Sequence, residues 1–432
     1  MNYFRQLWYD MRHQKVMMWV SISGTAISIF LVMVMFMVDN LKTVELAPET
    51  DRTRIYEGLN MHIRSLEDPE KESGGYLTYD AAQRLYGNLD GVEQVAYCYS
   101  MVIPQNIMIK GGIPLKVSTF IVDGNYWNMY DFNFVSGRPF TEEECLDATN
   151  RIVLSQRIAQ KLFSSTDVVG REVNIGGVNH IVSGVVEDTN PILKNSWSDV
   201  YVTLDSNSRN RIMGRSNQTV MGSLKVLLKY EKNTDPEYVK QQVKSRYNAL
   251  NSELAKQDWE IVYHGTPYSI EERAKFKTFT DPDVKSHQRR RSLLYLVLIL
   301  LPAINLSSMV RGRLQRRVSE IGVRRAYGAT RRSILLQLLG ENLIVTLAGG
   351  VVGFVFTFLF MLFMSSEFFI LAESDFFFNV AMATPTFDML FMWSPFIFAL
   401  GICFVLNLLT ATIPAWKAAS VEPAVAISKS KN

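Results

Sequence analysis

The sequence RGRLQRRVSEIGVRRAYGATRRS, residues 311–333, lies between two apolar stretches and decides how the whole chain is organised. It holds eight arginines and a single acidic residue, Glu320. An excess of Lys and Arg in a short loop between membrane spans keeps that loop in the cytoplasm. We therefore predict a cytoplasmic loop here, and within it residues 320–329, EIGVRRAYGA, form the most specific motif of the chain.

The average composition resembles that of a soluble protein, with 48% hydrophobic and 20% charged residues. The average hides four stretches without a charged residue: 16–38, 292–310, 343–364 and 392–413. Because an α-helix rises about 1.5 Å per residue, stretches of this length can cross a hydrocarbon core of about 30 Å. The sequence thus predicts an α-helical membrane protein with four transmembrane helices.

The charges beside these stretches predict the orientation. Residues 1–15 and the tail 414–432 carry an excess of Lys and Arg, whereas the connection 365–391 is acidic and has no basic residue. Both termini are therefore predicted to be cytoplasmic and residues 365–391 to lie outside. Arginines 289–291 then fall on the outer side, which is tolerated because large domains translocate largely regardless of charge.

Residues 1–15 have an amphipathic pattern, with Phe4, Leu7, Trp8 and Met11 at the spacing of one helix face. We predict an interfacial helix, with a plain cytoplasmic extension of the first span as the alternative. A cleaved signal peptide is disfavoured because the apolar stretch is long and no small-residue cleavage site closely follows it.

The polar block of residues 39–291 is predicted to be a mixed α+β extracytoplasmic domain inserted between the first and second spans. Thr141 and Glu144 have the spacing of a capping box. Asp235 followed by Pro236 indicates a second helix start. Both signals place helices in a block that also contains strands.

The strand signals of this block surround glycine pairs. Runs 107–110 and 115–122 flank Gly111-Gly112, and runs 173–175 and 180–186 flank Gly176-Gly177, as in β-hairpins. Two later runs, 224–229 and 261–263, favour a second α+β unit.

Motifs for catalysis and metal binding are missing from the sequence. It has no Gly-x4-Gly-Lys-Ser/Thr loop, so ATP is not bound by that route. The five histidines are scattered and form no His-Glu-x-x-His pair, so we predict no metal site and no enzymatic activity. The net charge of +3 gives no reason to expect a nucleic acid partner, since the basic residues serve topology. Cys98 and Cys145 could form a disulfide in an oxidising compartment, but two unpaired buried thiols are favoured.

Small residues on the apolar stretches predict close helix packing. Gly24 and Ser28, like Gly349 and Gly353, are four positions apart and so lie on one helix face. Packing within one subunit and packing between subunits both remain open.

Polar residues near the second and third spans have structural roles in this interpretation. Pro302 is expected to kink the second span, and Asn305 to hydrogen-bond across a helix interface. Thr330 is expected to cap a helix that begins near Arg331 and whose first turns, from residue 334, follow the inner interface. Glu341 is expected to pair with loop arginines or face the headgroup layer, since a charge deeper in the bilayer costs about 2.5–3.5 kcal/mol.

The stretch EIGVRRAYGATRR, with Ile334, Gln337 and Glu341 after it, resembles the cytoplasmic signature of the FtsX-like permease superfamily of ABC transporters. Tyr327 stands where that family more often has leucine. The tail from Pro414 to Ala426 resembles its carboxy-terminal motif. In the polar block, Gly137-Arg138-Pro139-Phe140 and residues 159–163, 169–171 and 183–188 are similar to the periplasmic core domain of MacB-type permeases.

The resemblance implies a permease subunit without a cofactor of its own, whose ABC ATPase partner binds ATP and Mg. Small residues would allow close approach of that partner, and charged ones would fix its register. The residues implied in this coupling are Glu320, Ile321, Gly322, Arg324, Arg325, Ala326, Gly328 and Ala329. The alternative is that the arginines only bind anionic membrane lipids and enforce topology.

The resemblance further implies a dimer, either of two copies or with a related permease, in a bacterial inner membrane. Its function would be export or extrusion of a substrate that the sequence does not identify, with a periplasmic adaptor and an outer-membrane duct as further partners to consider. The alternative function is an FtsX-like signalling subunit that activates a cell-wall hydrolase.

Overall fold

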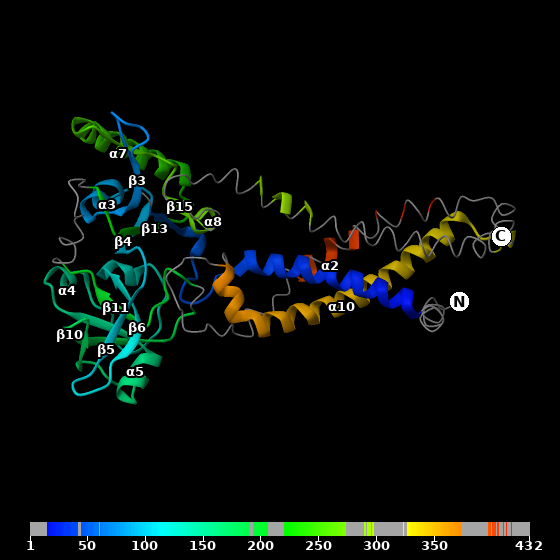
Figure 1. The fold of residues 1–432 in the computed structure, drawn as a ribbon, viewed down its shortest axis with the longest axis horizontal. Coiled ribbons are helices and arrows are strands. Elements are labelled where there is room, and N and C mark those ends of the chain that lie inside the picture. The colour runs from blue at the N-terminus through cyan, green and yellow to red at the C-terminus, as the bar shows by residue number, and fades with distance from the viewer. Residues whose placement is uncertain are drawn as a thin grey trace. The chain divides into compact units, whose positions relative to one another are not determined.

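The computed structural model describes residues 15–41, 45–59, 61–190, 193–205, 220–273 and 326–372. It also describes helical positions at 289–290, 292–294, 296–297, 323, 396–398, 400–402, 404–405, 409, 412 and 416. The chain divides into two compact units (Figure 1). We call Met1–Leu41 with Gln288–Asn432 the helical unit and Lys42–His287 the β unit.

Two long helices dominate the helical unit, α2 (Lys15–Leu41) and α10 (Arg331–Ala372). The backbone N–H of Ser333 donates to Thr330 Oγ1 at 3.2 Å, which confirms the predicted cap at the start of α10. The helix continues past Met364, the end predicted for the third span. No Gly or Pro occurs between Met364 and Ala372 to interrupt it.

Within the described residues one helical window, Leu343–Phe360, is long and apolar enough to cross a membrane, and Ile22–Met35 is a shorter apolar stretch. The predicted second and fourth spans, 292–310 and 392–413, are described only at scattered positions. The predicted interfacial helix and most of the connection 365–391 lie outside the described residues. The count of four membrane helices therefore stays a prediction.

The β unit has fifteen strands within the described residues. Their bounds are β1 (Ile55–Gly58), β2 (Met61–Ser65), β3 (Glu72–Leu77), β4 (Val92–Tyr99), β5 (Ile103–Met108), β6 (Leu115–Val122), β7 (Phe134–Gly137), β8 (Arg151–Ser155), β9 (Glu172–Ile175), β10 (Val178–Val186), β11 (Val200–Thr203), β12 (Met221–Gly222), β13 (Leu224–Tyr230), β14 (Trp259–Val262) and β15 (Tyr268–Ser269). The α-helices are α3 (Tyr79–Tyr86), α4 (Glu142–Leu146), α5 (Gln156–Phe163), α7 (Pro236–Leu254) and α8 (Ile270–Arg273), with 3-10 turns at Arg52–Arg54, Gly124–Asn128 and Ala255–Gln257.

The main strand order is β11-β8-β10-β9-β5-β6-β4-β13-β3-β2-β14. β11 also pairs with β6, in parallel, so the first six strands of this order close into a ring. Apolar side chains from the ring strands and from α5 form one core, which includes Ile107, Val117, Ile152, Val173, Val182 and Val200.

The expected hairpins are confirmed. Ile107 pairs with Leu115 across Gly111-Gly112, and Val178 pairs with Ile175 across Gly176-Gly177. The helix starts are confirmed as well, because the capping box at Thr141 is complete and Asp235 caps α7.

The prediction of a separate second α+β unit is wrong. β13 pairs with β4 from Leu224 opposite Tyr99 to Tyr230 opposite Val92, and β4 pairs with β6 at Cys98 opposite Val122. The later strands therefore belong to the same sheet as the predicted hairpins, within one compact unit. What they do possess is a core of their own, where α3 and α7 bury Leu85, Val239, Val243 and Leu250 against β2, β3 and β13 (Figure 1). The pairing of strands that are far apart in the sequence has no local sequence signal, so the sequence analysis could not predict that β13 joins this sheet.

A third core is aromatic and contains both cysteines of the β unit. Cys98 and Cys145 are buried thiols that form no disulfide, and they pack among Phe120, Tyr126 and Trp127. Burial raises the pKa of the Cys98 thiol to about 12. The two cysteines thus act as small apolar residues here.

Candidate coupling turn and helix-packing site

The described part of the coupling motif is a junction between two helices. The backbone N–H of Tyr327 donates to the carbonyl of Val323 at 3.1 Å, as in a helical turn. Gly328 follows with a φ of +92°, and Thr330 then caps α10. A glycine at positive φ after a helical turn is the usual helix stop, because it lacks the Cβ that this conformation disfavours.

This junction presents an open surface. The Tyr327 side chain is 88% exposed, and Ala326 is also exposed. A Cβ built on Gly328 meets no atom within 4 Å among the residues that the structure describes. We refer to residues 326–330 as the coupling turn.

The structure places three of the eight predicted coupling residues, Ala326, Gly328 and Ala329, in this turn. The other five, Glu320, Ile321, Gly322, Arg324 and Arg325, lie outside the described residues. The same holds for Pro302 and Asn305. Glu341 belongs to α10, but the structure does not describe its side chain.

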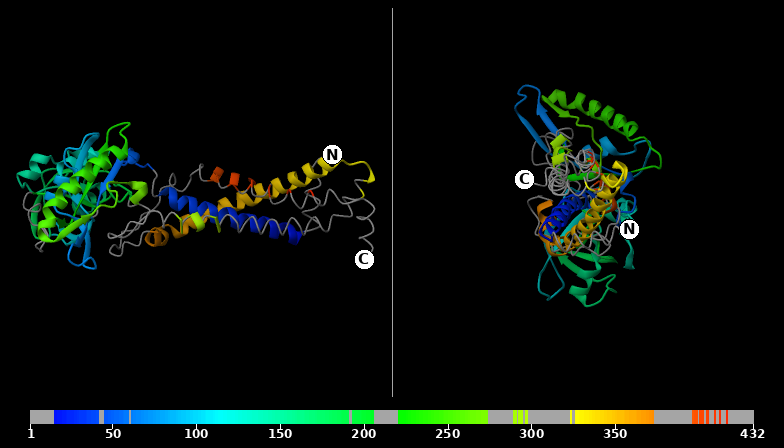
Figure 2. Two further views of the ribbon diagram at one scale, coloured as in Figure 1. Left: turned by 90° about the horizontal axis from the view of Figure 1, so that it is seen from above. Right: turned by 90° about the vertical axis from the view of Figure 1, so that its right-hand side faces the viewer.

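The predicted packing glycines of α10 lie against α2, and Figure 2 shows the two helices side by side in both views. A Cβ added to Gly349 would stand 2.7 Å from the Cβ of Thr25. A Cβ added to Gly353 would stand 2.7 Å from the carbonyl oxygen of Ala26. The Gly349 and Gly353 face is therefore occupied by a helix of the same chain.

Two hydroxyl groups at this interface donate to carbonyls of their own helices. Ser28 Oγ donates to the Gly24 carbonyl at 2.7 Å, and Thr357 Oγ1 donates to the Gly353 carbonyl at 2.8 Å. Such bonds suit an apolar surrounding, where an unpaired hydroxyl is costly. Around them pack the apolar side chains of Ile29, Val32, Met33, Phe354, Phe396 and Leu400.

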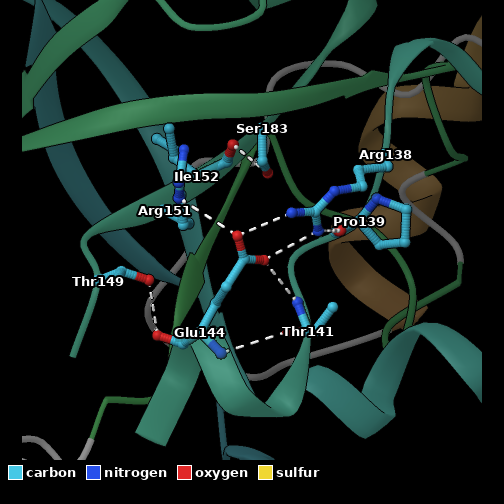
Figure 3. A network of polar contacts seen from close by, with 8 residues as sticks. All are labelled: Arg138, Pro139, Thr141, Glu144, Thr149, Arg151, Ile152 and Ser183. Carbon is cyan, nitrogen blue, oxygen red and sulfur yellow. Dashed lines mark hydrogen bonds and ion pairs between the residues drawn. The ribbon is translucent and has the colours of Figure 1, made fainter. Parts of the chain in front are cut away.

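In the β unit, the Gly137-Arg138-Pro139-Phe140 motif is explained by structure (Figure 3). Gly137 has a φ of +70°, and a Cβ there would stand 2.3 Å from the Ser183 carbonyl oxygen. Arg138 binds both carboxylate oxygens of Glu144, at 3.0 and 2.9 Å. Phe140 is buried in the aromatic core.

Glu144 joins this motif to the start of α4 (Figure 3). Its carboxylate accepts from the Thr141 backbone N–H at 2.9 Å, and its own N–H donates to Thr141 Oγ1 at 3.3 Å. On the other side of this carboxylate, Arg151 Nε lies 3.5 Å from Glu144 Oε1. The hydrogen bond from Arg138 is the largest of the effects that hold the pKa of Glu144 below its ordinary value. The motif therefore has a structural role: it joins the end of β7 to α4 through Glu144.

Two groups of polar residues, one around the buried His62 and one fully buried, have no counterpart in the sequence analysis. His62 Nδ1 lies 2.8 Å from His264 Nε2, and His62 Nε2 lies 3.0 Å from Glu72. Among the described residues no group of three or more His, Cys, Asp or Glu side chains could hold a metal ion. The other group surrounds Glu57, Asn195 and Lys225, which are far apart in the sequence and carry no local motif.

Comparison with known proteins gives two family matches. Residues 18–246 match the model described as MacB-like periplasmic core domain, and residues 292–423 match the model described as FtsX-like permease C-terminal. The first match covers more than half of the chain.

Curated relatives agree with these matches. The macrolide export ATP-binding/permease protein MacB of Salmonella paratyphi A is 28% identical over 245 residues, which are 56% of this chain and 35% of that protein. The uncharacterized ABC transporter permease YknZ of Bacillus subtilis is 26% identical over 241 residues, 54% of each. The chain thus matches between 35% and 54% of the length of these relatives.

Solved structures of similar proteins include two extracytoplasmic domains. The extracellular domain of the transporter YknZ from Gram-positive bacteria is 19% identical with a TM-score of 0.32, and the match covers 47% of this chain and 100% of that one. The periplasmic region of MacB from Actinobacillus actinomycetemcomitans is 18% identical with a TM-score of 0.33, with coverage of 51% and 94%.

Proposed function

We propose a mechanical transport function for this chain, which belongs to the MacB-like family of ABC transporter permeases with an FtsX-like C-terminal region. In this proposal a separate ABC ATPase, which binds ATP and Mg, acts on residues 320–329 from the cytoplasm. The second membrane helix passes the motion to the β unit, which lies outside the membrane. The chain itself carries out no catalysis.

The observation that carries this proposal is the coupling turn. A partner protein needs an exposed, sterically open contact, and Tyr327 and Gly328 provide one beside the motif that resembles the coupling region. The turn leads directly into α10, which begins at Arg331, so in this proposal a displacement of the turn is passed into that helix. The sequence has no Gly-x4-Gly-Lys-Ser/Thr loop, so in this proposal ATP is bound by the ATPase partner.

The remaining features of the proposal are those expected of a member of this family. They are four membrane helices with both termini in the cytoplasm of a bacterium, and a dimer with a second copy or a related permease. The relatives named for macrolide export make a small amphiphile the first substrate class to test. No feature of the described residues favours the signalling alternative over transport.

The test uses the full-length chain purified with its ATPase. Gly328→Trp places a large side chain on the coupling turn, and we expect it to abolish ATPase association and stimulation. Gly170→Trp is the matched control, because Gly170 has a φ of +83° and equally open surroundings among the described residues, but lies in the β unit. Normal ATPase stimulation by Gly328→Trp would refute the assignment.

A further inference from the structure

Two segments of the β unit lead along the chain to the helical unit, and the structure pairs them with each other. The leading segment, residues 45–59, follows α2 and contains β1, and the trailing segment, residues 268–273, contains β15 and α8. β1 and β15 are antiparallel neighbours, with Tyr56 opposite Ser269 and Glu57 opposite Tyr268. A displacement of either segment therefore acts directly on the other segment.

Glu57 is the residue where these segments meet the rest of the sheet. Its side chain is buried, and Oε1 accepts a hydrogen bond from Asn195 Nδ2. Its other oxygen, Oε2, lies 3.9 Å from Nε of Arg273, the last residue of α8. One carboxylate therefore contacts the trailing segment and a loop that precedes β11.

Asn195 extends this contact to the centre of the sheet. Lys225 Nζ, on β13, donates to Asn195 Oδ1 at 2.5 Å, so the amide stands between a buried cation and a buried anion. Glu57 is opposite Leu227 in register, which places Glu57 and Lys225 on the same sheet face. β13 pairs with β1 on one side and with β4 on the other.

The leading segment also contains a buried ion pair of its own. Arg52 Nε lies 2.9 Å from Glu49 Oε2, and both side chains are almost inaccessible. The hydroxyl of Tyr126 donates to the Asn195 carbonyl at 2.7 Å, which fixes the loop against the aromatic core.

Buried ion pairs add little net stability, because removing the charges from water offsets their attraction. The hydrogen bonds that Asn195 makes with Lys225 and Glu57 are directional, however, whereas apolar contacts are not. The hydrogen bonds from Lys225 through Asn195 to Glu57 therefore add a directional side-chain link between β13 and the leading segment to the backbone pairing of β1 with β13.

We propose that Glu57, Asn195 and Lys225 form a joint that transmits displacement of the leading and trailing segments into the sheet of the β unit. The proposal rests on the mechanical function proposed above and assigns these three side chains as positioning residues in it.

The experiment measures ATP-driven motion within the β unit of the full-length chain bound to its ATPase. Spin labels at Ile113→Cys and Tyr238→Cys, two exposed positions on the β5–β6 hairpin and on α7, report a distance in a Cys403→Ala background. The distance distribution is recorded without nucleotide and after trapping with ATP and vanadate.

The test variant is Glu57→Leu/Asn195→Leu/Lys225→Met, which removes the joint without leaving an unpaired charge among these three. We expect it to fold and to support normal ATP hydrolysis, while the nucleotide-dependent shift in distance is lost. Arg84→Met/Glu253→Leu is the matched control, since it removes an ion pair of 2.6 Å between α3 and α7, and it should keep the shift.

A shift that persists in the triple variant would overturn the joint and leave the mechanical function intact. A parent protein with no shift at all would instead contradict the mechanical function itself. If the triple variant does not fold, the same distance is measured in Glu57→Gln. This variant keeps an oxygen that accepts from Asn195 and removes only the charge. We expect that variant to hydrolyse ATP normally with a diminished shift, and an unchanged shift would refute the joint.

Discussion

Gly349 of α10 lies so close to Thr25 of α2 that a Cβ at Gly349 would stand 2.7 Å from the Thr25 Cβ. Real Cβ atoms do not approach this closely, so any larger residue at position 349 must push the two helices apart. The first and third predicted membrane spans are thus fitted to each other within one chain, at the point where the sequence has its small residues.

Gly349→Leu should therefore destabilise the helical unit. Overpacking of a close contact costs about 1–3 kcal/mol, and here it displaces backbone as well as side chains. Thermal unfolding of the purified protein in detergent would show a lower midpoint. Gly340→Leu is the matched control on the same helix, because no atom of the described residues lies within 4 Å of a Cβ there. Equal midpoints for the two variants would contradict the packing.

Glu144→Gln should reduce the loss of unfolding free energy that the protein shows when the pH is lowered. The folded-state pKa of Glu144 is lowered, chiefly by its hydrogen bond from Arg138, so its contribution is complete above the unfolded pKa and is lost as pH falls through the folded value. The window lies below the ordinary value of 4.5. Urea unfolding at neutral pH and below pH 4.5 would show a smaller difference for the variant than for the parent. A variant with the parent's full acid sensitivity would rule out Glu144 as the source.

Arg246→Ala should destabilise the contact between α3 and α7. The guanidinium donates to the carbonyl of Leu85 at 3.4 Å and to that of Asn88 at 2.7 Å, so it satisfies acceptors at the end of α3. Hydrogen bonds from a charged group contribute about 1.5–3 kcal/mol. Urea unfolding measures the loss, with Lys244→Ala, an exposed position on the same helix, as the control.

Cys98 and Cys145 should resist thiol reagents in the folded protein and react after denaturation. Both thiols are buried, and burial raises the pKa of Cys98 to about 12, so very little reactive thiolate forms at neutral pH. Peptide mass spectrometry after maleimide treatment, without reducing agent, measures this. Recovery of a peptide with the two cysteines joined would show the disulfide that the structure lacks.

The sequence predicted features that are encoded by neighbouring residues. The caps at Thr141, Asp235 and Thr330 and the two glycine hairpins depend on residues within a few positions of one another, so their physical signal is local. Membership in the MacB-like permeases followed from motifs of the same kind.

The sequence could not predict contacts between distant residues. The pairing of Leu224 with Tyr99 joins residues that are 125 positions apart, and the sequence analysis predicted no strand at residues 92–99. The hydrogen bond between Asn195 and Glu57 spans 138 positions, and neither residue has a neighbour that signals it. Such features depend on the closed chain topology, which a single sequence does not specify locally.

Photo-crosslinking from the coupling turn tests the central claim most directly. Tyr327 is replaced by p-benzoylphenylalanine in intact cells, with Ile113, a similarly exposed residue of the β unit, as the control position. The account predicts that light joins position 327 to an ABC ATPase and that position 113 forms no such product. Labelling of Tyr327→Cys by a membrane-impermeant reagent added to intact cells, together with no ATPase product from position 327, would contradict it.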